Sequence, residues 1–247
     1  MPGSCIKAPF RGFGGQSMAA GRKNKRKKIA EINTMSNVYQ CPDFGETHLY
    51  SSAGEKLDLK GKWKKDIFKN DNPITLELAC GKGDYTIALA SKYPERNFVG
   101  VDIKGPRIHT GAKAALESGL TNVAFARFKI ESILNFFAPQ EVSEIWITFP
   151  DPFPRDRSEK HRLTYHTFLE KYKAVLKPGG VINFKTDDLP LFHFTRDSIN
   201  AFGCETLYYR ENIYATPLEM EELSIKTYYE KQHIADGRTI NYLRFKL

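Results

Sequence analysis

The chain has 247 residues, 41% of them hydrophobic, and a formal net charge of +8 at pH 7. This length suits one α/β domain with extensions, or at most two small units. The positive charge favours an acidic macromolecular partner. An anionic membrane surface is a weaker candidate, because the sequence contains no long apolar span and no basic amphipathic helix with a strong aromatic face.

The cysteines and histidines give no sign of a metal site. The four cysteines, Cys5, Cys41, Cys80 and Cys204, form no C-x-x-C pair and have no histidine at ligand spacing, and the six histidines contain no H-E-x-x-H. We therefore expect a reduced, cytoplasmic protein without metal.

The amino-terminal part, residues 1–36, is predicted to be a disordered leader followed by a basic arm. Residues before Met18 lack a hydrophobic signal core, and Met18 is an alternative start. Residues 22–28 then hold six cations. This run is either an arm that reaches for nucleic acid or a solvated tail. Residues 37–70 show only a weak pattern, with extended pieces and a Lys-rich turn at 60–65.

Regular alternation of strands and helices begins at residue 73. The pattern predicts five helices, at 84–93, 106–118, 131–137, 165–176 and 191–202. It predicts seven strands, at 74–79, 97–102, 122–128, 144–149, 181–185, 205–209 and 239–246. Such alternation indicates an α/β protein with a doubly wound, mainly parallel seven-stranded sheet and helices on both faces.

A glycine turn where the first of these strands meets its helix predicts a cofactor site. Gly81 and Gly83 allow close backbone approach to a ligand, and Asp102 ends the next strand, where dinucleotide folds bind ribose hydroxyls. A dinucleotide fingerprint needs a third glycine, but Thr86 stands there. Nearby acids such as Glu77 suit a cationic sulfonium better than a pyrophosphate. The alternative for Glu77 is a strand-end acid satisfied by a local N–H.

The loop at 149–162 carries the most informative motif. Asp151 stands between Pro150 and Pro152, which fix φ and remove two donors. A tract with five cationic or potentially cationic side chains follows, which suits a phosphate backbone arriving beside a fixed acid. The alternative is an ordinary proline-rich connector.

Five motifs of the chain resemble those of the bacterial tRNA (guanine-N(7)-)-methyltransferases. They read LELACGKG, GVDIK, FPDPFPR, KTD and TYYE, the last at 227–230. The resemblance covers residues 24–247. The proline-aspartate loop and the late Thr-x-x-Glu are specific, whereas the glycine turn is common to many methyltransferases.

This resemblance implies a Rossmann-like methyltransferase domain at 37–247 that uses S-adenosylmethionine to methylate the variable-loop guanine of tRNA at N7. The acids Glu77, Asp102 and Asp151 match cofactor-contacting positions, and Asp151 also matches the family's proposed catalytic residue. Substrate-binding positions fall on Arg155, Asp187, Thr227, Tyr228, Tyr229 and Glu230. The RNA-contacting tract falls on Arg157, Lys160, His161 and Arg162.

The chain also departs from the family pattern. Lys129 stands where an acid usually meets the adenine, so either Glu131 substitutes or backbone groups at Ile130 and Glu131 read that ring. Phe153 replaces a usual tryptophan but keeps a stacking face. Asp156 and Glu159 dilute the basic tract.

Three other functions compete with this hypothesis. A methyltransferase with another substrate would share the cofactor site, and a non-catalytic RNA-binding relative would keep the basic tract. A nicotinamide dehydrogenase is disfavoured by the missing third glycine. Thr-x-x-Glu is also a helix capping box, so residues 227–230 have a purely structural alternative. We expect tRNA as partner, no membrane, and a monomer or homodimer.

Overall fold

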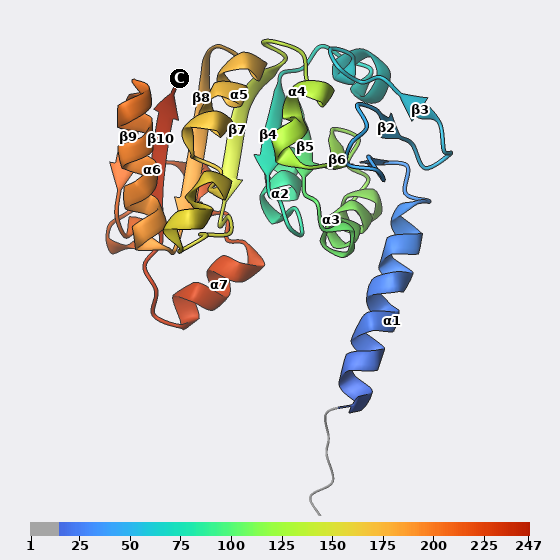
Figure 1. Ribbon diagram of the computed structural model, residues 1–247, viewed down its shortest axis with the longest axis horizontal. Coiled ribbons are helices and arrows are strands. Elements are labelled where there is room, and N and C mark those ends of the chain that lie inside the picture. The colour runs from blue at the N-terminus through green and yellow to red at the C-terminus, as the bar shows by residue number, and fades with distance from the viewer. Residues whose placement is uncertain (1–14) are drawn as a thin grey trace, which may run out of the picture.

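The computed structural model describes the backbone of residues 15–247 and the side chains of residues 24–247. Within this part of the chain, ten strands form one mixed sheet (Figure 1). The order is β3-β2-β1-β6-β5-β4-β7-β8-β10-β9. The strands are β1 (Val38–Gln40), β2 (Leu49–Tyr50), β3 (Lys56–Leu57), β4 (Ile74–Leu78), β5 (Asn97–Val101), β6 (Val123–Arg127), β7 (Val142–Thr148), β8 (Leu176–Thr186), β9 (Glu205–Arg210) and β10 (Asn241–Lys246).

Seven helices and five short turns of helix connect or flank these strands in the described residues. The α-helices are α1 (Gly15–Ile32), α2 (Asp84–Lys92), α3 (Gly105–Glu117), α4 (Ile133–Phe136), α5 (His166–Val175), α6 (Leu189–Phe202) and α7 (Tyr228–Ala235). The short turns are η1 (Trp63–Phe68), η2 (Ile130–Ser132), η3 (Asp156–His161), η4 (Ile213–Ala215) and η5 (Glu221–Ser224).

The doubly wound α/β prediction is confirmed, but the strand count of seven is wrong. All seven predicted strands are present and adjacent, from β6 to β9. Three further strands, β1 to β3, extend the sheet beyond β6. They are only two or three residues long, too short to show alternation, so their sequence gave no period to detect. Strand β8 is also longer than predicted, because it begins at Leu176, directly after α5.

The two faces of the sheet are covered by different helices. Leu76 and Ile147 belong to the core on the side of α4, α5 and α6. Tyr85 and Trp146 belong to the core on the side of α2 and α3, with their rings 5.0 Å apart. Every residue of β4 and β5 is buried. Burial on both faces is why these strands read as near-continuous apolar runs.

The strand order places a topological switch point between β4 and β7. From β4 the chain winds outward through β5 and β6, whereas β7 and β8 lie on the opposite side. Crossover connections therefore diverge at the carboxyl ends of β4 and β7. In open α/β sheets, ligands bind in the crevice that opens there.

Helix α1 spans residues 15–32, which include the basic run at 22–28. Most of the predicted disordered leader falls in residues 1–14, which lie outside the described part. Ile32 is fully buried. Glu31 lies 2.5 Å from His109 of α3, and Lys28 donates to Thr110 at 3.1 Å. These contacts fix the end of α1 on α3, while its other end projects past the carboxyl ends of the strands (Figure 1).

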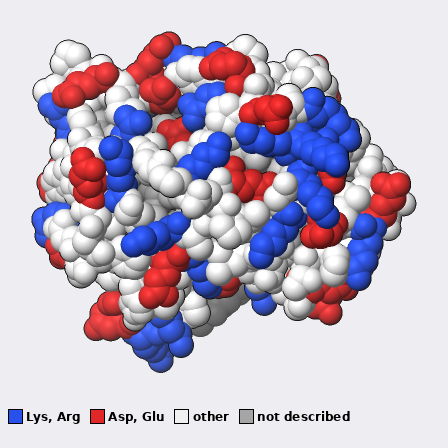
Figure 2. Space-filling view, turned by 90° about the horizontal axis from the view of Figure 1, so that it is seen from above, with Lys and Arg blue, Asp and Glu red and all other residues white. Residues whose placement is uncertain are grey.

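The Lys-rich turn predicted at 60–65 lies at the start of η1. It is at the end of the sheet where the parallel strands begin, opposite the end that carries the switch point. Glu141, just before β7, accepts from the backbone N–H groups of Gly61 and Trp63. Seen from above, this edge mixes both charges, with Lys and Arg gathered on one side (Figure 2). No helix within 15–247 has the length and apolar character needed to cross a bilayer.

Candidate active site

A cavity of about 340 Å³ opens at the carboxyl ends of β4, β5, β6 and β7. This volume lies within the usual range for small-molecule sites. Its lining comes from the turns after these four strands and from the end of the basic tract: Ala79, Asp102, Ile103, Lys104, Arg107, Phe128, Lys129, Ile130, Glu131, Phe149, Pro150, Asp151, Phe153, His161 and Leu163.

The glycine turn after β4 packs tightly against the core at Gly83 and has open space beside Gly81. Gly83 has φ 70°, and a Cβ there would lie 2.5 Å from the Phe125 ring. Gly81 has φ 58°, and a Cβ there would meet nothing within 4 Å. Gly83 therefore satisfies packing, whereas the open side of Gly81 permits the close backbone approach that a ligand needs. Neither glycine is part of the cavity lining itself.

Asp102 joins the turns after β4 and β5. Its Oδ2 accepts from the N–H of Gly81 at 2.8 Å, and its Oδ1 accepts from the N–H of Lys104 at 2.7 Å. Burial raises the pKa of Asp102, and these two N–H groups oppose the rise. The carboxylate is thus held in one orientation on the cavity wall, where its remaining lone pairs can accept from hydroxyl groups.

Glu77, predicted to contact the cofactor, lies within β4 near its carboxyl end. It is 3% exposed and is not part of the lining. Its Oε2 accepts from the N–H and hydroxyl of Thr86, and its Oε1 accepts from the Thr148 hydroxyl at 3.0 Å. Burial raises the pKa of Glu77 to about 7. The alternative of a strand-end acid satisfied by local donors describes this geometry.

Backbone strain gathers at the cavity. Ala79, Phe149 and Phe153 all line it and have positive φ values of 56°, 51° and 46°. Such conformations cost non-glycine residues free energy and persist where the surrounding structure requires them. The loops after β4 and β7 are therefore held in unusual shapes on two sides of one cavity.

Asp151 stands at the mouth of the cavity. Its side chain is 71% exposed, and its Oδ2 lies 3.7 Å from Nζ of Lys104 on the opposite loop. A carboxylate with both oxygens accessible can accept hydrogen bonds from an incoming molecule. The loop thus brings an exposed carboxylate to the edge of the cavity.

The basic tract forms η3 beside this loop. Arg155, Arg157, Lys160 and His161 are exposed along it. Arg162 differs, because its guanidinium donates to the carbonyl of Phe153 at 3.2 Å and its side chain is only 12% exposed. We therefore assign Arg162 to holding the loop, and the other four side chains remain available to phosphate groups.

Residues 227–230, predicted to bind substrate, have different surroundings. Thr227 caps α7, and its hydroxyl accepts from the N–H of Glu230. Tyr228 is 48% exposed, with Nζ of Lys82 3.5 Å from its ring centroid. Tyr229 faces Arg107, which lines the cavity, at 5.6 Å. Glu230 is fully buried. Both tyrosines thus lie near the glycine turn and the cavity wall, whereas Glu230 points into the protein.

Asp187, a further predicted substrate-binding residue, follows β8. Its Oδ2 accepts from Nη1 of Arg238 at 2.8 Å and lies 3.4 Å from Nδ1 of His233. His233 in turn stacks on Phe149 at 5.9 Å. Asp187 therefore links the end of β8 to α7, and His233 in turn contacts the loop that carries Asp151. The Asp187 side chain is only 13% exposed.

The turn after β6 contributes the third side of the cavity, which includes Ile130 and Glu131. Lys129, at the family's acidic position, extends toward Phe44, with Nζ 5.3 Å from the ring. The sequence alone did not identify Lys104, Arg107 or Phe128 as lining residues. Lys104 lies in the GVDIK motif, but nothing in the motif indicates its contact with Asp151.

Comparison with known proteins agrees with this geometry. A family profile described as "Putative methyltransferase" matches residues 71–243. A tRNA (guanine-N(7)-)-methyltransferase of Christiangramia forsetii is 47% identical over 92% of this chain and 99% of its own. One of Bacteroides thetaiotaomicron is 43% identical over 91% of this chain and 86% of its own.

Solved structures show the same fold at low identity. An antibiotic-related methyltransferase has TM-score 0.57 and 19% identity, covering 77% of this chain and 95% of its own. A 16S rRNA (adenine(1408)-N(1))-methyltransferase from Catenulisporales acidiphilia, solved with its cosubstrate, has TM-score 0.55 and 18% identity over 77% and 92%. The fold and site thus define an S-adenosylmethionine-dependent methyltransferase of the Rossmann-like class. With the sequence relatives, they place the chain in the tRNA (guanine-N(7)-)-methyltransferase family.

Among the described residues, no three His, Cys, Asp or Glu side chains gather in a way that could hold a metal ion.

Proposed function

We propose that this protein transfers a methyl group from S-adenosylmethionine to N7 of a guanine in the variable loop of tRNA. The observation that carries the proposal is the position of Asp151, an accessible acid at the mouth of the cavity and beside the exposed cations of η3. A free carboxylate can bind a base edge, and the cations can bind the phosphates next to it.

The cavity residues fit S-adenosylmethionine. Asp102 presents an oriented carboxylate to ribose hydroxyls, Phe128 and Ile130 offer apolar surface to an adenine, and Gly81 leaves room above its backbone. Acids on the wall, including Glu131, suit a donor with positive charge. When bound, this cosubstrate supplies an electrophilic methyl group on a sulfonium.

Guanine N7 needs no general base, because its lone pair is free and carries no proton. The protein's main tasks are therefore alignment of the base and stabilisation of the positive charge that the purine acquires. We propose that Asp151 accepts hydrogen bonds from the N1–H and N2–H edge of the guanine and stabilises that charge. Its 71% exposed side chain leaves both oxygens available for these bonds.

A stacked guanine is hard to reach, so the base is expected to leave its stack and rest on an aromatic ring. Phe153 lines the cavity next to Asp151, while Tyr228 and Tyr229 lie on its α7 side. Arg155, with Arg157, Lys160 and His161 of η3, would then bind the flanking phosphates.

The amino-terminal part extends the RNA-binding surface in this proposal. We propose one methyltransferase domain at 37–247 preceded by a basic arm within 1–36. Helix α1 supports the arm, because it carries exposed cations including Lys25 and Lys27. The helix extends on the carboxyl side of the sheet (Figure 1). We also propose a cytoplasmic monomer or homodimer, in keeping with the free thiols of Cys41 and Cys80.

The test is direct mapping of methylated nucleotides in a tRNA transcript after incubation with the protein and labelled S-adenosylmethionine. We expect one N7-methylguanine in the variable loop. A transcript with 7-deazaguanine at that position is the matched control, because it keeps the base edge and lacks N7. Label on the control transcript, or at another atom of the unmodified one, would contradict the proposal.

A second arm of the experiment separates catalysis from binding alone. Filter binding of the same transcript measures its affinity in the absence of the methyl donor. Tight binding with no methyl product would identify a non-catalytic RNA-binding relative instead. Methyl transfer to a small molecule or protein, with none to tRNA, would identify a methyltransferase with another substrate.

A further inference from the structure

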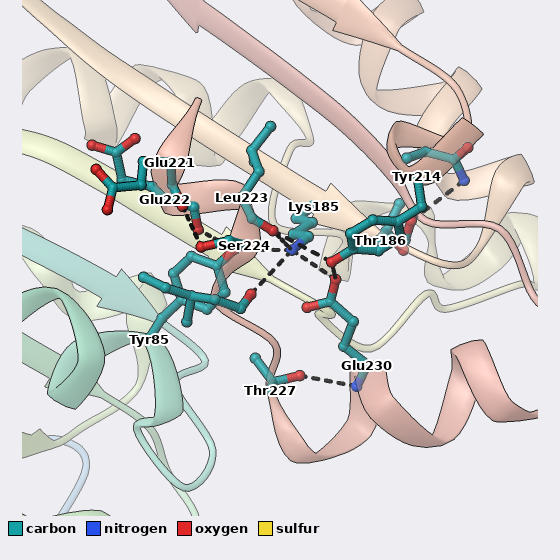
Figure 3. A network of polar contacts seen from close by, with 12 residues as sticks. Tyr85, Lys185, Thr186, Tyr214, Glu221, Glu222, Leu223, Ser224, Thr227 and Glu230 are labelled. Atoms are coloured by element: carbon teal, nitrogen blue, oxygen red, sulfur yellow. Dashed lines mark hydrogen bonds and ion pairs between the residues drawn. The ribbon is translucent and has the colours of Figure 1, made fainter. Parts of the chain in front are cut away.

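A fully buried ion pair lies under α7, next to the site but outside the cavity (Figure 3). Nζ of Lys185, on β8, lies 2.7 Å from Oε1 of Glu230, and both side chains are 0% exposed. The same ammonium donates to the hydroxyl of Tyr85 at 3.0 Å and to the carbonyls of Leu223 and Ile225, each at 3.3 Å. One cation therefore joins β8, α2, η5 with the residue after it, and α7.

Glu230 is oriented from three directions. Its Oε1 also accepts from the Tyr214 hydroxyl at 2.6 Å, and its N–H donates to the Thr227 side chain at 3.0 Å. In a capping box the acid at this position turns back to the backbone of the cap residue. Here the carboxylate turns inward to Lys185 instead (Figure 3). Thr-x-x-Glu in this chain thus starts a helix and fixes that helix to the sheet.

Lys185 also holds the loop that carries Asp151. Its carbonyl accepts from the N–H of Phe149 at 2.8 Å, two residues before Asp151. From the other side, His233 of α7 stacks on the Phe149 ring. The side chain of Lys185 therefore fixes α7, its backbone fixes the loop, and α7 packs on the same loop.

A contribution to the free energy of unfolding does not by itself explain why this ion pair is buried. Removing two charges from water is costly, and a well-packed apolar pair of similar volume often stabilises a protein equally well. A charged pair in a fixed set of acceptors does, however, specify one arrangement of the surrounding elements. Burial lowers the pKa of Lys185 to about 8, and the Glu230 carboxylate opposes that effect.

We propose that Lys185 and Glu230 form a positioning pair, which sets α7 against the Asp151 loop. This placement holds Tyr228 beside Lys82 of the glycine turn and Tyr229 beside Arg107 of the cavity wall. In this assignment Glu230 affects methyl transfer through α7 and does not touch the base. The inference rests on the proposed function for its kinetic consequence only, because the placement of α7 is measurable without tRNA.

The test compares Lys185→Met, Glu230→Met and the double variant, which replace charged side chains by apolar ones of similar length. Two signals are measured: amide hydrogen exchange in α7, and kcat and KM for tRNA. We expect each single variant to lower kcat by about 10-fold or more and to alter KM less. The double variant should be no slower than the worse single one, because both remove the same interaction.

The matched control is the ion pair between Lys246 and Glu205, whose Nζ and Oε2 lie 3.7 Å apart on neighbouring strands at the far end of the sheet. In the variant with both residues changed to Met, amide hydrogen exchange in α7 and kcat for tRNA should equal those of the wild type. Tyr214→Phe removes the hydroxyl that donates to Glu230. This variant should lower kcat by about 3-fold and speed amide hydrogen exchange in α7.

Several results would overturn the inference. If the single effects on kcat multiply in the double variant, the two residues act separately. If Lys185→Met keeps full activity while Glu230→Met loses it, Glu230 touches the base itself. Wild-type exchange in α7 of the double variant or of Tyr214→Phe also contradicts it. A wild-type protein that makes no N7-methylguanine would refute the proposed function instead, and exchange in α7 would still decide the role of the pair.

Discussion

Two acids at the carboxyl edge of the sheet have opposite surroundings. Glu77, on β4, is 3% exposed and accepts three hydrogen bonds from Thr86 and Thr148. Asp151, after β7, has a 71% exposed side chain whose nearest cation is 3.7 Å away. In sequence Glu77 lies within one apolar strand and Asp151 follows another, and the resemblance implies cofactor contact for both. The hydrogen bonds of Glu77 join β4 to α2 and β7, whereas the Asp151 carboxylate stays exposed.

The largest expected effect comes from Asp151→Asn. This substitution keeps the shape and removes the charge, so kcat for tRNA methylation should fall by about 10²-fold or more. Because the side chain is exposed, the free energy of unfolding should stay within about 0.5 kcal/mol of wild type. Single-turnover methylation and denaturant unfolding measure the two quantities. Asp197→Asn, at an exposed acid on α6, is the control, and equal rates for the two variants would remove the proposed role of Asp151.

Glu77 should instead affect stability, and in a pH-dependent way. With its pKa raised to about 7 from 4.5, the folded protein keeps a proton that the unfolded chain has lost between those values. The free energy of unfolding therefore falls as pH rises through that window, by up to about 3 kcal/mol from this group. Glu77→Gln should remove this slope.

Denaturant unfolding at several pH values between about 4.5 and 8 measures the Glu77 effect. The difference between wild type and Glu77→Gln isolates this group from others that titrate in the same range. Asp151→Asn serves as the comparison and should follow the wild-type curve. Parallel curves for wild type and Glu77→Gln would mean that the carboxylate stays charged in its buried position.

The basic tract should contribute affinity, with a smaller effect than that of Asp151. Replacing Arg155, Arg157 and Lys160 together by Ala should weaken tRNA binding by about 10-fold at moderate salt and make it less salt-dependent, because fewer counterions are released. Binding measured across a salt series gives both quantities. The control replaces Lys60, Lys65 and Lys69 at the opposite end of the sheet by Ala, which removes the same number of charges. It should change neither the tRNA affinity nor its salt dependence. An equal loss of affinity in both variants would indicate a nonspecific charge effect.

The smallest effect is expected from Lys104→Met. The pair of Lys104 with Asp151 is exposed on both sides, and such pairs contribute about 0–1 kcal/mol. We expect unfolding free energy to change by less than about 0.5 kcal/mol and kcat by less than about 3-fold. A loss of kcat as large as that of Asp151→Asn would instead show that Asp151 works only when Lys104 holds it.

Much of the fold followed from local pattern. The glycine turn at Gly81 and Gly83, the proline entry to α3, and the apolar runs of β4 and β5 each have a strong local cause, and the structure has them where predicted. Strands β1 to β3 could not be predicted from local pattern, because two or three residues are too few to show alternation of apolar and polar side chains. Their place in the sheet depends on the pairing of β1 with β6.

The site was predictable in part for the same reason. Asp102 and Asp151 end or follow parallel strands, so the topology alone directs them to one edge. Whether an acid there is free depends on donors from distant segments, as Thr86 and Thr148 show for Glu77. The partner of Glu230, 45 positions earlier in the chain, likewise has no local signal in the Thr-x-x-Glu motif.

By itself the sequence determined the doubly wound class, the glycine turn after β4 and the loop with Asp151, because these depend on periodicity, glycine conformation and proline stiffness within a few residues. Only the tertiary structure decided which charges are buried and paired. Burial and hydrogen bonding are set by side chains that the fold brings together, so Glu230 and Lys185 became one interior pair while Asp151 remained at the surface.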